Sequence, residues 1–318
     1  MNSKHYLALS GGVGGAKLAL GLSKVLPADA LTIGVNVGDD FEHLGLTICP
    51  DIDTVLYTLS DLVHPQQGWG RNDESWGVLD ELKRLNAESW FLLGDRDIAL
   101  HLLRLQLRQQ GLSLSEITAR LAQQLGVHSI VAPVTDSPLR TMVETDQGRL
   151  AFQDYFVRLR CAPELRSLDF QGASAARLSP AVRAALNHPD LAGVILCPSN
   201  PYLSIAPMLA VVELRQSLRA LQAPVIAVSP IVAGDAIKGP TAKITRELGV
   251  QPTATVVADL YADFIDAVLI DTADAPLAAN DTRLVVASTV MKTTEQKIAL
   301  ARVCVGLIDK LRDTQGGS

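Results

Sequence analysis

The sequence predicts an α/β fold in which helices flank a mainly parallel β-sheet. Three observations predict it. Short apolar runs of strand length alternate with helical patterns along most of the chain. A glycine-rich turn joins the first strand to the first helix, and loops rich in Ser, Asn and Asp follow several later strands. A hairpin pattern in the middle of the chain further predicts an inserted α+β subdomain.

Composition limits the classes of protein to consider. With 318 residues, 48% apolar and 19% charged, the chain can bury one large core or two smaller ones. The net charge is −6 and no run of Lys and Arg occurs, so nucleic acid is not an expected partner. No apolar stretch reaches membrane-spanning length and no signal-peptide pattern occurs, so we expect no membrane partner and a cytoplasmic location. The four cysteines are scattered, which is typical of reduced thiols.

The first strand, predicted over Tyr6–Leu9, leads into a turn that contains Gly11, Gly12, Gly14 and Gly15, and a helical pattern follows. Glycine lets the backbone approach a ligand closely, and the first N–H groups of a helix can bind an anion. The turn is therefore a candidate phosphate site. It lacks the Gly-Lys-Ser/Thr of a P-loop and the spacing of a dinucleotide fingerprint. The alternative is a turn that only packs the helix against its strand.

A second strand is predicted over Leu31–Val37, and it runs into the acidic pair Asp39 and Asp40. Ligands bind at the carboxyl ends of strands in open α/β sheets, where a carboxylate can hold Mg²⁺ beside substrate phosphates. We therefore expect a metal ligand among these two residues; the alternative is a helix cap or a solvated turn. Residues 41–50 are expected to form a connection, and a helix with Asp53 as its N-cap follows.

Residues 63–190 are predicted to be an elaboration on a nucleotide-binding core formed by residues 1–62 and 191–318, although no Ser/Gly linker separates them. The elements expected in this part are helices over 75–85, 98–110 and 113–125, strands over 90–93 and 130–132, and a hairpin over 141–157. The third helix begins with a capping box, Ser113-x-x-Glu116.

Two polar stretches of this elaboration have a structural and a functional interpretation. The loop 63–72, a candidate lid, and the residues after it contain Trp69, Arg71 and Trp76, which either cover a flat aromatic ligand or pack locally. The Asp-Arg-Asp sequence around Arg96 is either a helix cap with a local ion pair or a polar clamp on a substrate.

The strand–helix alternation resumes near residue 193. Two strands of this part end in loops, 198–202 and 229–240, that should lie on the same sheet edge as the glycine turn. Lys238 in the second loop either neutralises a phosphate or is an exposed turn residue. The remaining expected elements are strands over 193–197, 224–228, 267–270 and 284–287, and helices over 208–221, 241–248 and 293–311.

Six motifs, in this order, resemble the 2-phospho-L-lactate transferase (CofD) family of coenzyme F-420 biosynthesis: SGGVGGAKL, VNVGDD, CPDIDTVLY, LGDRD, PSNPYLSI and SPIVAGDAIKGP. The resemblance implies a Rossmann-like core, a homodimer and a requirement for Mg²⁺. It also implies the reaction, in which a guanosine diphosphate diester transfers a phosphoryl-linked three-carbon acid to the ribityl hydroxyl of the deazaflavin Fo. GMP is released and an F-420-0 type product forms. The acid is phospholactyl, phosphoenolpyruvyl or phosphoglyceryl, and no residue identified here decides which.

The resemblance also implies roles for residues that match the motifs. The four glycines would hold the diphosphate, and Asp39 or Asp40, with Asp40 preferred, would hold Mg²⁺ and act in catalysis. Contacts with Fo would come from Asp53 and Arg96, and contacts with the guanosine nucleotide from Ser199, Asn200 and the loop that carries Lys238.

Two other classes of protein share parts of this pattern. A non-catalytic regulator that binds nucleotide-sugars would keep the glycine turn and the acidic pair, but we would not expect it to keep CPDIDTV and LGDRD, which this chain has. A nicotinamide dehydrogenase is a weaker alternative, because the glycine spacing and the ribose-binding acid do not fit. The sequence therefore favours the transferase.

Overall fold

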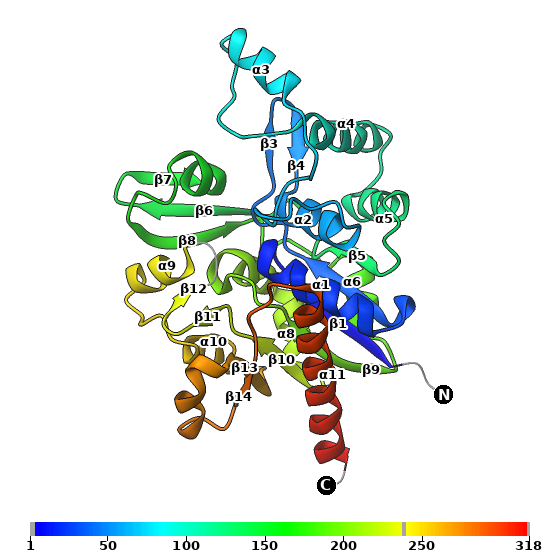
Figure 1. Ribbon diagram of the computed structural model, residues 1–318, viewed down its shortest axis with the longest axis vertical. Helices are drawn as coiled ribbons and strands as arrows, with labels where there is room; N and C mark the ends of the chain where they lie inside the picture. Colours follow the sequence, from blue (N-terminus) through cyan, green and yellow to red (C-terminus); the bar gives the residue numbers. More distant parts are fainter. Residues whose placement is uncertain (1–3, 237–239, 317–318) are drawn as a thin grey trace.

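The computed structural model describes residues 4–236 and 240–316. Its centre is a seven-stranded sheet with the order β14-β13-β10-β9-β1-β2-β5, in which every neighbouring pair is parallel (Figure 1). This sheet confirms the predicted fold class. The strands are β1 (His5–Ser10), β2 (Leu31–Val35), β5 (Ile130–Pro133), β9 (Leu191–Leu196), β10 (Val225–Val228), β13 (Ala267–Asp271) and β14 (Leu284–Ala287).

The strand order reverses between β1 and β9. After β1 the chain adds β2 and β5 on one side, and it then returns to add β9, β10, β13 and β14 on the other side. Ligands of open α/β sheets bind at the carboxyl ends of the strands beside such a reversal. Because β5 belongs to the central sheet, part of the range 63–190 lies in the core; the division into a core and an inserted subdomain stays a prediction.

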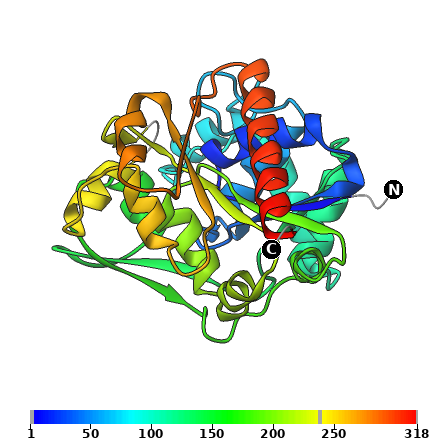
Figure 2. The same ribbon diagram turned by 90° about the horizontal axis from the view of Figure 1, so that it is seen from below.

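Helices flank the sheet (Figure 2), and β1, β2 and β13 are buried along their whole length, as parallel strands covered on both faces should be. Gly21 of α1 (Val13–Val25) permits close packing on α11 (Thr294–Gly316), because a Cβ there would lie 2.1 Å from the Lys297 carbonyl oxygen. The other α-helices are α2 (Pro50–Leu59), α3 (Gly77–Arg84), α4 (Asp95–Gln109), α5 (Leu114–Gln124), α6 (Pro180–Leu186), α7 (Ala206–Ala210), α8 (Val212–Ala220), α9 (Thr241–Glu247) and α10 (Thr255–Leu260).

Three small antiparallel sheets lie outside the central sheet. The predicted hairpin is confirmed as β6 and β7, and a third strand, β8, pairs with β6. The capping box of Ser113 and Glu116 is also confirmed at the start of α5. The small sheets are β3 (Phe41–His43) with β4 (Leu46–Ile48), β6 (Arg140–Thr145) with β7 (Gly148–Ala151) and β8 (Leu165–Gln171), and β11 (Ile231–Val232) with β12 (Asp235–Ala236). The short helices are η1 (Ala28–Ala30), η2 (Asp154–Arg158), η3 (Pro201–Ile205) and η4 (Thr272–Ala279).

Two expectations for the region before α2 are wrong. Residues 41–50 are not a plain connection, because β3 and β4 form a hairpin within them. Asp53 is not an N-cap, because α2 begins earlier, at Pro50, with Cys49 in the capping position. Proline suits the first turn of a helix, where its missing N–H costs no hydrogen bond. Asp53 therefore lies inside the helix, where its carboxylate is buried and accepts a hydrogen bond from Arg104.

Two further elements differ from expectation. Residues 90–93 form no strand; the rings of Trp90 and Phe91 instead pack against Phe41, with centroids 6.2 Å and 4.8 Å from its ring. The helix expected over 208–221 is interrupted at Val211, whose backbone is extended, so that α7 and α8 are separate. Within the described ranges, no helix is both long enough and apolar enough to cross a bilayer.

Candidate functional site

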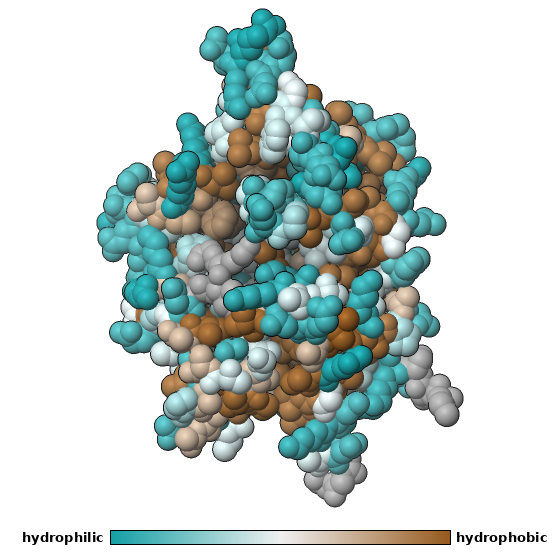
Figure 3. All heavy atoms as spheres, viewed as in Figure 1, coloured by the Kyte–Doolittle hydropathy of each residue, from teal (hydrophilic) through white to brown (hydrophobic). Residues whose placement is uncertain are grey.

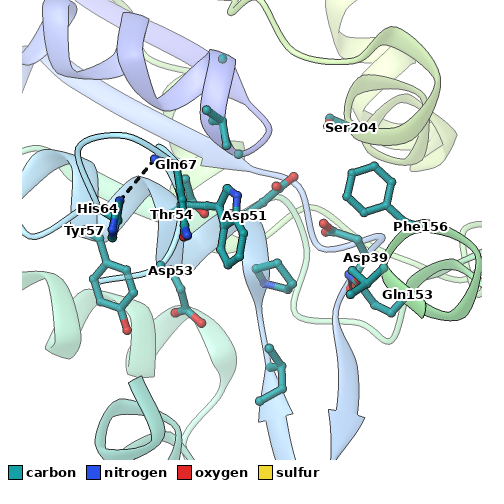
Figure 4. Close-up of a pocket in the computed structure, with 18 of the residues that line it drawn as sticks. Asp39, Asp51, Asp53, Thr54, Tyr57, His64, Gln67, Gln153, Phe156 and Ser204 are labelled. Atoms are coloured by element: carbon teal, nitrogen blue, oxygen red, sulfur yellow. Dashed lines mark hydrogen bonds between the residues drawn. The ribbon is translucent and has the colours of Figure 1, made fainter. Parts of the chain in front are cut away.

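A cavity of about 950 Å³ opens at the carboxyl ends of β1, β2 and β9, beside the reversal of strand order. Its lining includes the glycine turn, Asp39 after β2, the start of α2, residues between 64 and 101, the segment 152–160 and the loop after β9, together with residues after β10, at the start of α9 and before α11. Figure 4 shows the cavity with side chains from several of these parts directed into it. The described chain therefore brings the sequence motifs together around one space.

The glycine turn packs tightly against the loop after β9. A Cβ on Gly14 would lie 2.2 Å from the Pro198 carbonyl oxygen, and one on Gly15 would lie 2.5 Å from Ser199 Oγ. The N–H of Gly11 donates to Ser199 Oγ at 2.9 Å. These contacts support the structural interpretation of the turn, in which its glycines allow the helix to pack closely. Gly11 and Gly15 lie outside the cavity lining.

The part of the turn that faces the cavity is the start of α1. Gly12, Val13 and Gly14 line the cavity, and the first intrahelical bond of α1 runs from Ala16 N–H to the Gly12 carbonyl. The N–H groups just inside a helix start carry partial positive charge, which favours a bound anion. Lys17 also lines the cavity, and its ammonium donates to the Met291 carbonyl at 3.3 Å. The sequence analysis did not single out Lys17, which is a candidate phosphate ligand by its position in the lining.

Asp39 and Asp51 come from different parts of the chain and face one another within the cavity (Figure 4). Asp39 follows β2, and Asp51 lies in the first turn of α2. The side-chain amide of Asn36 donates to both carboxylates, at 3.0 Å each. Gly12 allows the approach of Asp51, because a Cβ there would lie 2.5 Å from Asp51 Oδ1. Sequence reasoning missed Asp51, although it lies in the CPDIDT motif.

The two facing carboxylates destabilise each other's charged form. Burial raises the pKa of Asp39 well above its usual value, and the charges of Asp51 and Asp40 raise it further. Burial also raises the pKa of Asp51 to about 6, although hydrogen bonds from Asn36 and the Gly12 N–H oppose the shift. A cation between the carboxylates would reverse this penalty.

Asp40 has a different environment from Asp39. It is buried but does not line the cavity, and its carboxyl group lies beside the Cys49 thiol. Burial raises its pKa to about 8. Asp39 lines the cavity and Asp40 does not, so the placement favours Asp39 over the Asp40 that the sequence preferred.

The pair of Asp39 and Asp51 fits Mg²⁺ in its number and kind of ligands. Mg²⁺ is usually held by one or two carboxylates, with water and substrate phosphates completing its octahedron. Among residues 4–236 and 240–316, no group of three His, Cys, Asp or Glu side chains is arranged to hold a metal ion. Two carboxylates beside a helix start that favours anions therefore fit Mg²⁺ better than a metal that needs a complete set of protein ligands.

A buried polar cluster forms the wall of the cavity farther along α2. Arg104 is fully buried and donates to Asp53, to the Thr47 carbonyl at 3.1 Å and to His101 Nδ1 at 2.9 Å. Because a guanidinium only donates, Nδ1 of His101 accepts, and a neutral ring carries its proton on Nε2. The remaining oxygen of Asp53, Oδ2, is buried without a hydrogen-bond partner. Asp53 and His101 both line the cavity.

Aromatic side chains line the outer part of the cavity beyond this cluster. Trp69 is 47% exposed and Trp76 is 42% exposed, and Trp90 lies nearby in the same lining. The guanidinium of Arg71 lies 5.5 Å from the centroid of the Tyr57 ring, a cation–π contact that holds this arginine at the wall. Such a wall suits a flat, conjugated ring system.

Two carboxylates hold this outer part in place, and we name them the paired caps. Glu74 accepts from the N–H groups of Arg96 and Asp97 at the start of α4, both at 2.9 Å. Asp95 accepts from the N–H groups of Gly77 and Val78 at the start of α3, both at 3.0 Å. The side chain of Arg96 is exposed outside the lining, whereas Asp97 lines the cavity.

The remaining predicted residues belong to the loops after β9 and β10. Ser199 and Asn200 line the cavity, but Asn200 Oδ1 is occupied by two N–H groups at the start of η3. Lys238 lies outside the described residues. Sequence reasoning also missed the segment before and within η2, where Phe156 lines the cavity and Gln153 donates to the Asp39 carbonyl at 3.0 Å.

Comparisons with known proteins show the family to which the chain is similar. Residues 7–305 match the family described as 2-phospho-L-lactate transferase CofD. A phosphoenolpyruvate transferase from Kitasatospora aureofaciens is 38% identical over 317 residues, which cover 96% of this chain and 98% of that protein. A 2-phospho-L-lactate transferase from Methanosarcina mazei is 34% identical over 306 residues, which cover 94% of this chain and 99% of that protein.

The fold also matches a solved structure of low sequence identity. A crystal structure of a UPF0052-family protein from Bacillus halodurans superposes with a TM-score of 0.63 at 14% identity, covering 94% of this chain and 99% of that one. At this identity the likeness concerns the architecture alone, and it agrees with a Rossmann-like α/β fold.

Proposed function

The chain belongs to the 2-phospho-L-lactate transferase CofD family, the transferases of coenzyme F-420 biosynthesis, and from this premise we propose its reaction. The protein transfers a phosphoryl-linked three-carbon acid from a guanosine diphosphate diester to the terminal ribityl hydroxyl of Fo. GMP is the leaving group. The relatives bear two names, phosphoenolpyruvate transferase and 2-phospho-L-lactate transferase, so both acids are candidate donor groups.

One observation carries this proposal. A single cavity joins an anion-binding end, with the start of α1 and the Asp39–Asp51 pair, to an aromatic end that contains Trp69 and Trp76. The first end suits a diphosphate with a divalent cation, and the second suits the ring system of a deazaflavin. The reacting hydroxyl and the distal phosphorus would then meet between the two ends.

The proposed mechanism depends on positioning and on charge neutralisation, as phosphoryl transfer generally does. The N–H groups of Val13 and Gly14, with Lys17, bind the diphosphate oxygens. Asp39 and Asp51 would hold Mg²⁺, which would neutralise charge on the phosphate groups when bound. The ribityl hydroxyl attacks the distal phosphorus, a new O–P bond forms, the bond to the GMP oxygen breaks, and the hydroxyl proton passes to water. Asp53, fixed by Arg104, would contact Fo beside the aromatic wall.

A transfer assay with matched carboxylate variants tests the proposal. Purified protein, Mg²⁺ and Fo are mixed with each of the three guanosine donors, and mass spectrometry identifies the product. We expect a phosphodiester-linked product with one donor, and Asp51→Asn should lower its rate by 100-fold or more (roughly 10²–10³ for loss of a charge-stabilising group). Asp40→Asn is the matched control and should stay near the wild-type rate, because the Asp40 side chain lies outside the cavity lining.

Other outcomes would contradict parts of the proposal. A wild-type protein that forms no product with any donor, but binds a nucleotide-sugar tightly, would indicate the regulator considered from the sequence. Loss of activity in Asp40→Asn together with a normal rate in Asp51→Asn would mean that Asp40, and not Asp51, is the metal ligand. A homodimer and a cytoplasmic location remain part of the proposal; light scattering of the purified protein tests the homodimer.

A further inference from the structure

Asn36 lies at the point where β1, β2 and α2 converge. It follows the last residue of β2 and is fully buried. Its backbone N–H donates to the Ser10 carbonyl at the end of β1, at 3.0 Å. Its side chain points toward the start of α2, where it reaches Asp51. The residue therefore touches three of the elements that meet at the anion-binding end of the cavity.

Every hydrogen-bonding atom of the Asn36 side chain is used. Nδ2 donates one hydrogen to Asp39 Oδ1 and the other to Asp51 Oδ2, at 3.0 Å each. Oδ1 accepts from the Gly38 N–H at 2.9 Å, which fixes the orientation of the amide. A flipped amide would place its NH₂ group against an N–H donor, so this arrangement is the one that satisfies all partners.

We infer that Asn36 is a positioning residue that holds Asp39 and Asp51 together as a two-carboxylate site for one divalent cation. The inference rests on the proposed function. An amide bridges the carboxylates without adding charge, so it leaves their two negative charges for the cation. A lysine there would compete with the metal, whereas an aspartate would repel both neighbours. Residues that orient metal ligands in this way typically change metal affinity by about 10–100-fold when they are replaced.

The test measures metal binding by the full chain without substrates. Mn²⁺ serves as the probe for Mg²⁺, and electron paramagnetic resonance gives its dissociation constant. We expect Asn36→Ala to weaken Mn²⁺ binding at least tenfold. Thr32→Val is the matched control. Thr32 lies in β2, the strand that leads to Asn36, and the substitution removes its buried 3.1 Å contact with His5 of β1, away from the carboxylates. This variant should bind Mn²⁺ like the wild type.

Transfer kinetics distinguish positioning from a general structural role. In Asn36→Ala the Mg²⁺ concentration for half-maximal rate should rise about tenfold, and kcat should recover at high Mg²⁺. If this variant fails to fold by circular dichroism, Asn36→Ser replaces it with the same expectation, because a hydroxyl cannot bridge both carboxylates.

Three outcomes would overturn the inference, and they differ in what else they affect. If the wild type binds Mn²⁺ and Asn36→Ala binds it equally well, only the role of Asn36 is wrong. A kcat that stays low at every Mg²⁺ concentration, with unchanged Mn²⁺ affinity, would indicate a structural role. If the wild type binds no Mn²⁺, the Asp39–Asp51 metal site of the proposed function is lost as well.

Discussion

The two ends of the cavity are built in different ways. At the anion-binding end, buried side chains and backbone groups of β1, β2 and β9 contact each other directly, and a Cβ on Gly14 would meet backbone at 2.2 Å. At the aromatic end, exposed side chains such as Trp69 and Trp76 lie on a segment held by the paired caps, Glu74 and Asp95. The first end is closely packed around backbone, whereas the second is formed by more exposed side chains.

The surface around the aromatic end agrees with this difference. Helix α3 projects from the body of the molecule, and its outer surface is mostly hydrophilic (Figure 3). Leu79 is the one residue of α3 that is buried. A helix with so little buried apolar surface depends on its cap and its neighbours for stability. We therefore expect substitutions at the anion-binding end to change the stability of the whole fold, and substitutions at the paired caps to change the stability of the aromatic end alone.

The largest effect is expected at Arg104, which fixes the border between the two ends. Arg104→Met leaves Asp53 buried without its cation, which costs about 3–5 kcal/mol of the free energy of unfolding. Arg108→Met, one turn later, is the matched control. The Arg108 side chain is 50% exposed and lies 3.6 Å from Glu42, so its loss should cost about 0–1 kcal/mol. Equal costs in urea denaturation would contradict the role given to Arg104.

A smaller global effect is expected from Gly14→Ala. The new Cβ would force the glycine turn away from Pro198, at about 1–3 kcal/mol for overpacking, and donor binding should fall with it. Gly306→Ala is the control, because Gly306 lies in α11 with no atom within 4 Å of the added Cβ. It should raise stability by about 0.5–1 kcal/mol. A Gly14→Ala protein as stable as the wild type would show that this end is not rigid.

A local effect is expected from Asp95→Ala. All three tryptophans lie between residues 69 and 90, so tryptophan fluorescence reports on the aromatic end, and far-UV circular dichroism reports on the whole fold. In the variant, the fluorescence transition should precede the circular-dichroism transition in urea. Asp80→Ala, which removes an exposed carboxylate of α3, is the control. Coincident transitions in Asp95→Ala would mean that the aromatic end unfolds only with the core.

The smallest effect is expected from acid. Hydrogen bonds from the Ser75 hydroxyl and the Val78 N–H lower the pKa of Asp95 below its usual 3.8. The stabilisation from this cap is therefore fully present above about pH 4 and is lost as the pH falls through the lowered pKa. Tryptophan fluorescence should change below pH 4 before circular dichroism does. A fluorescence change centred near neutral pH would have another cause.

The fold was largely predictable because its signals are local. A parallel strand buried on both faces appears as a continuous apolar run, as in the stretch that forms β9. The capping box of α5 needs only Ser113 and Glu116, three residues apart. The hairpin of β3 and β4 was not predictable in this way, because its strands have three residues each and little apolar alternation.

Contacts in the site were predictable from the sequence only where both contacting residues belong to one motif. Asp51 meets Asp39 because the β3–β4 hairpin turns the chain back on itself, and Asp53 meets Arg104 from 51 residues away. Such contacts leave no local pattern. Which of Arg96 and Asp97 faces the cavity depends on the rotation of α4 about its axis, because adjacent helical residues point about 100° apart. The side chain that lines the cavity is Asp97, not the predicted Arg96.

The most direct test of the two-ended cavity is to measure ligand binding to two variants by isothermal titration calorimetry. Asp51→Asn should weaken binding of GDP with Mg²⁺ about 10–100-fold and leave Fo binding within twofold. Trp69→Ala/Trp76→Ala should do the reverse, because a stacked ring contributes about 1–3 kcal/mol. Loss of the same ligand in both variants would contradict the assignment of donor and acceptor to opposite ends.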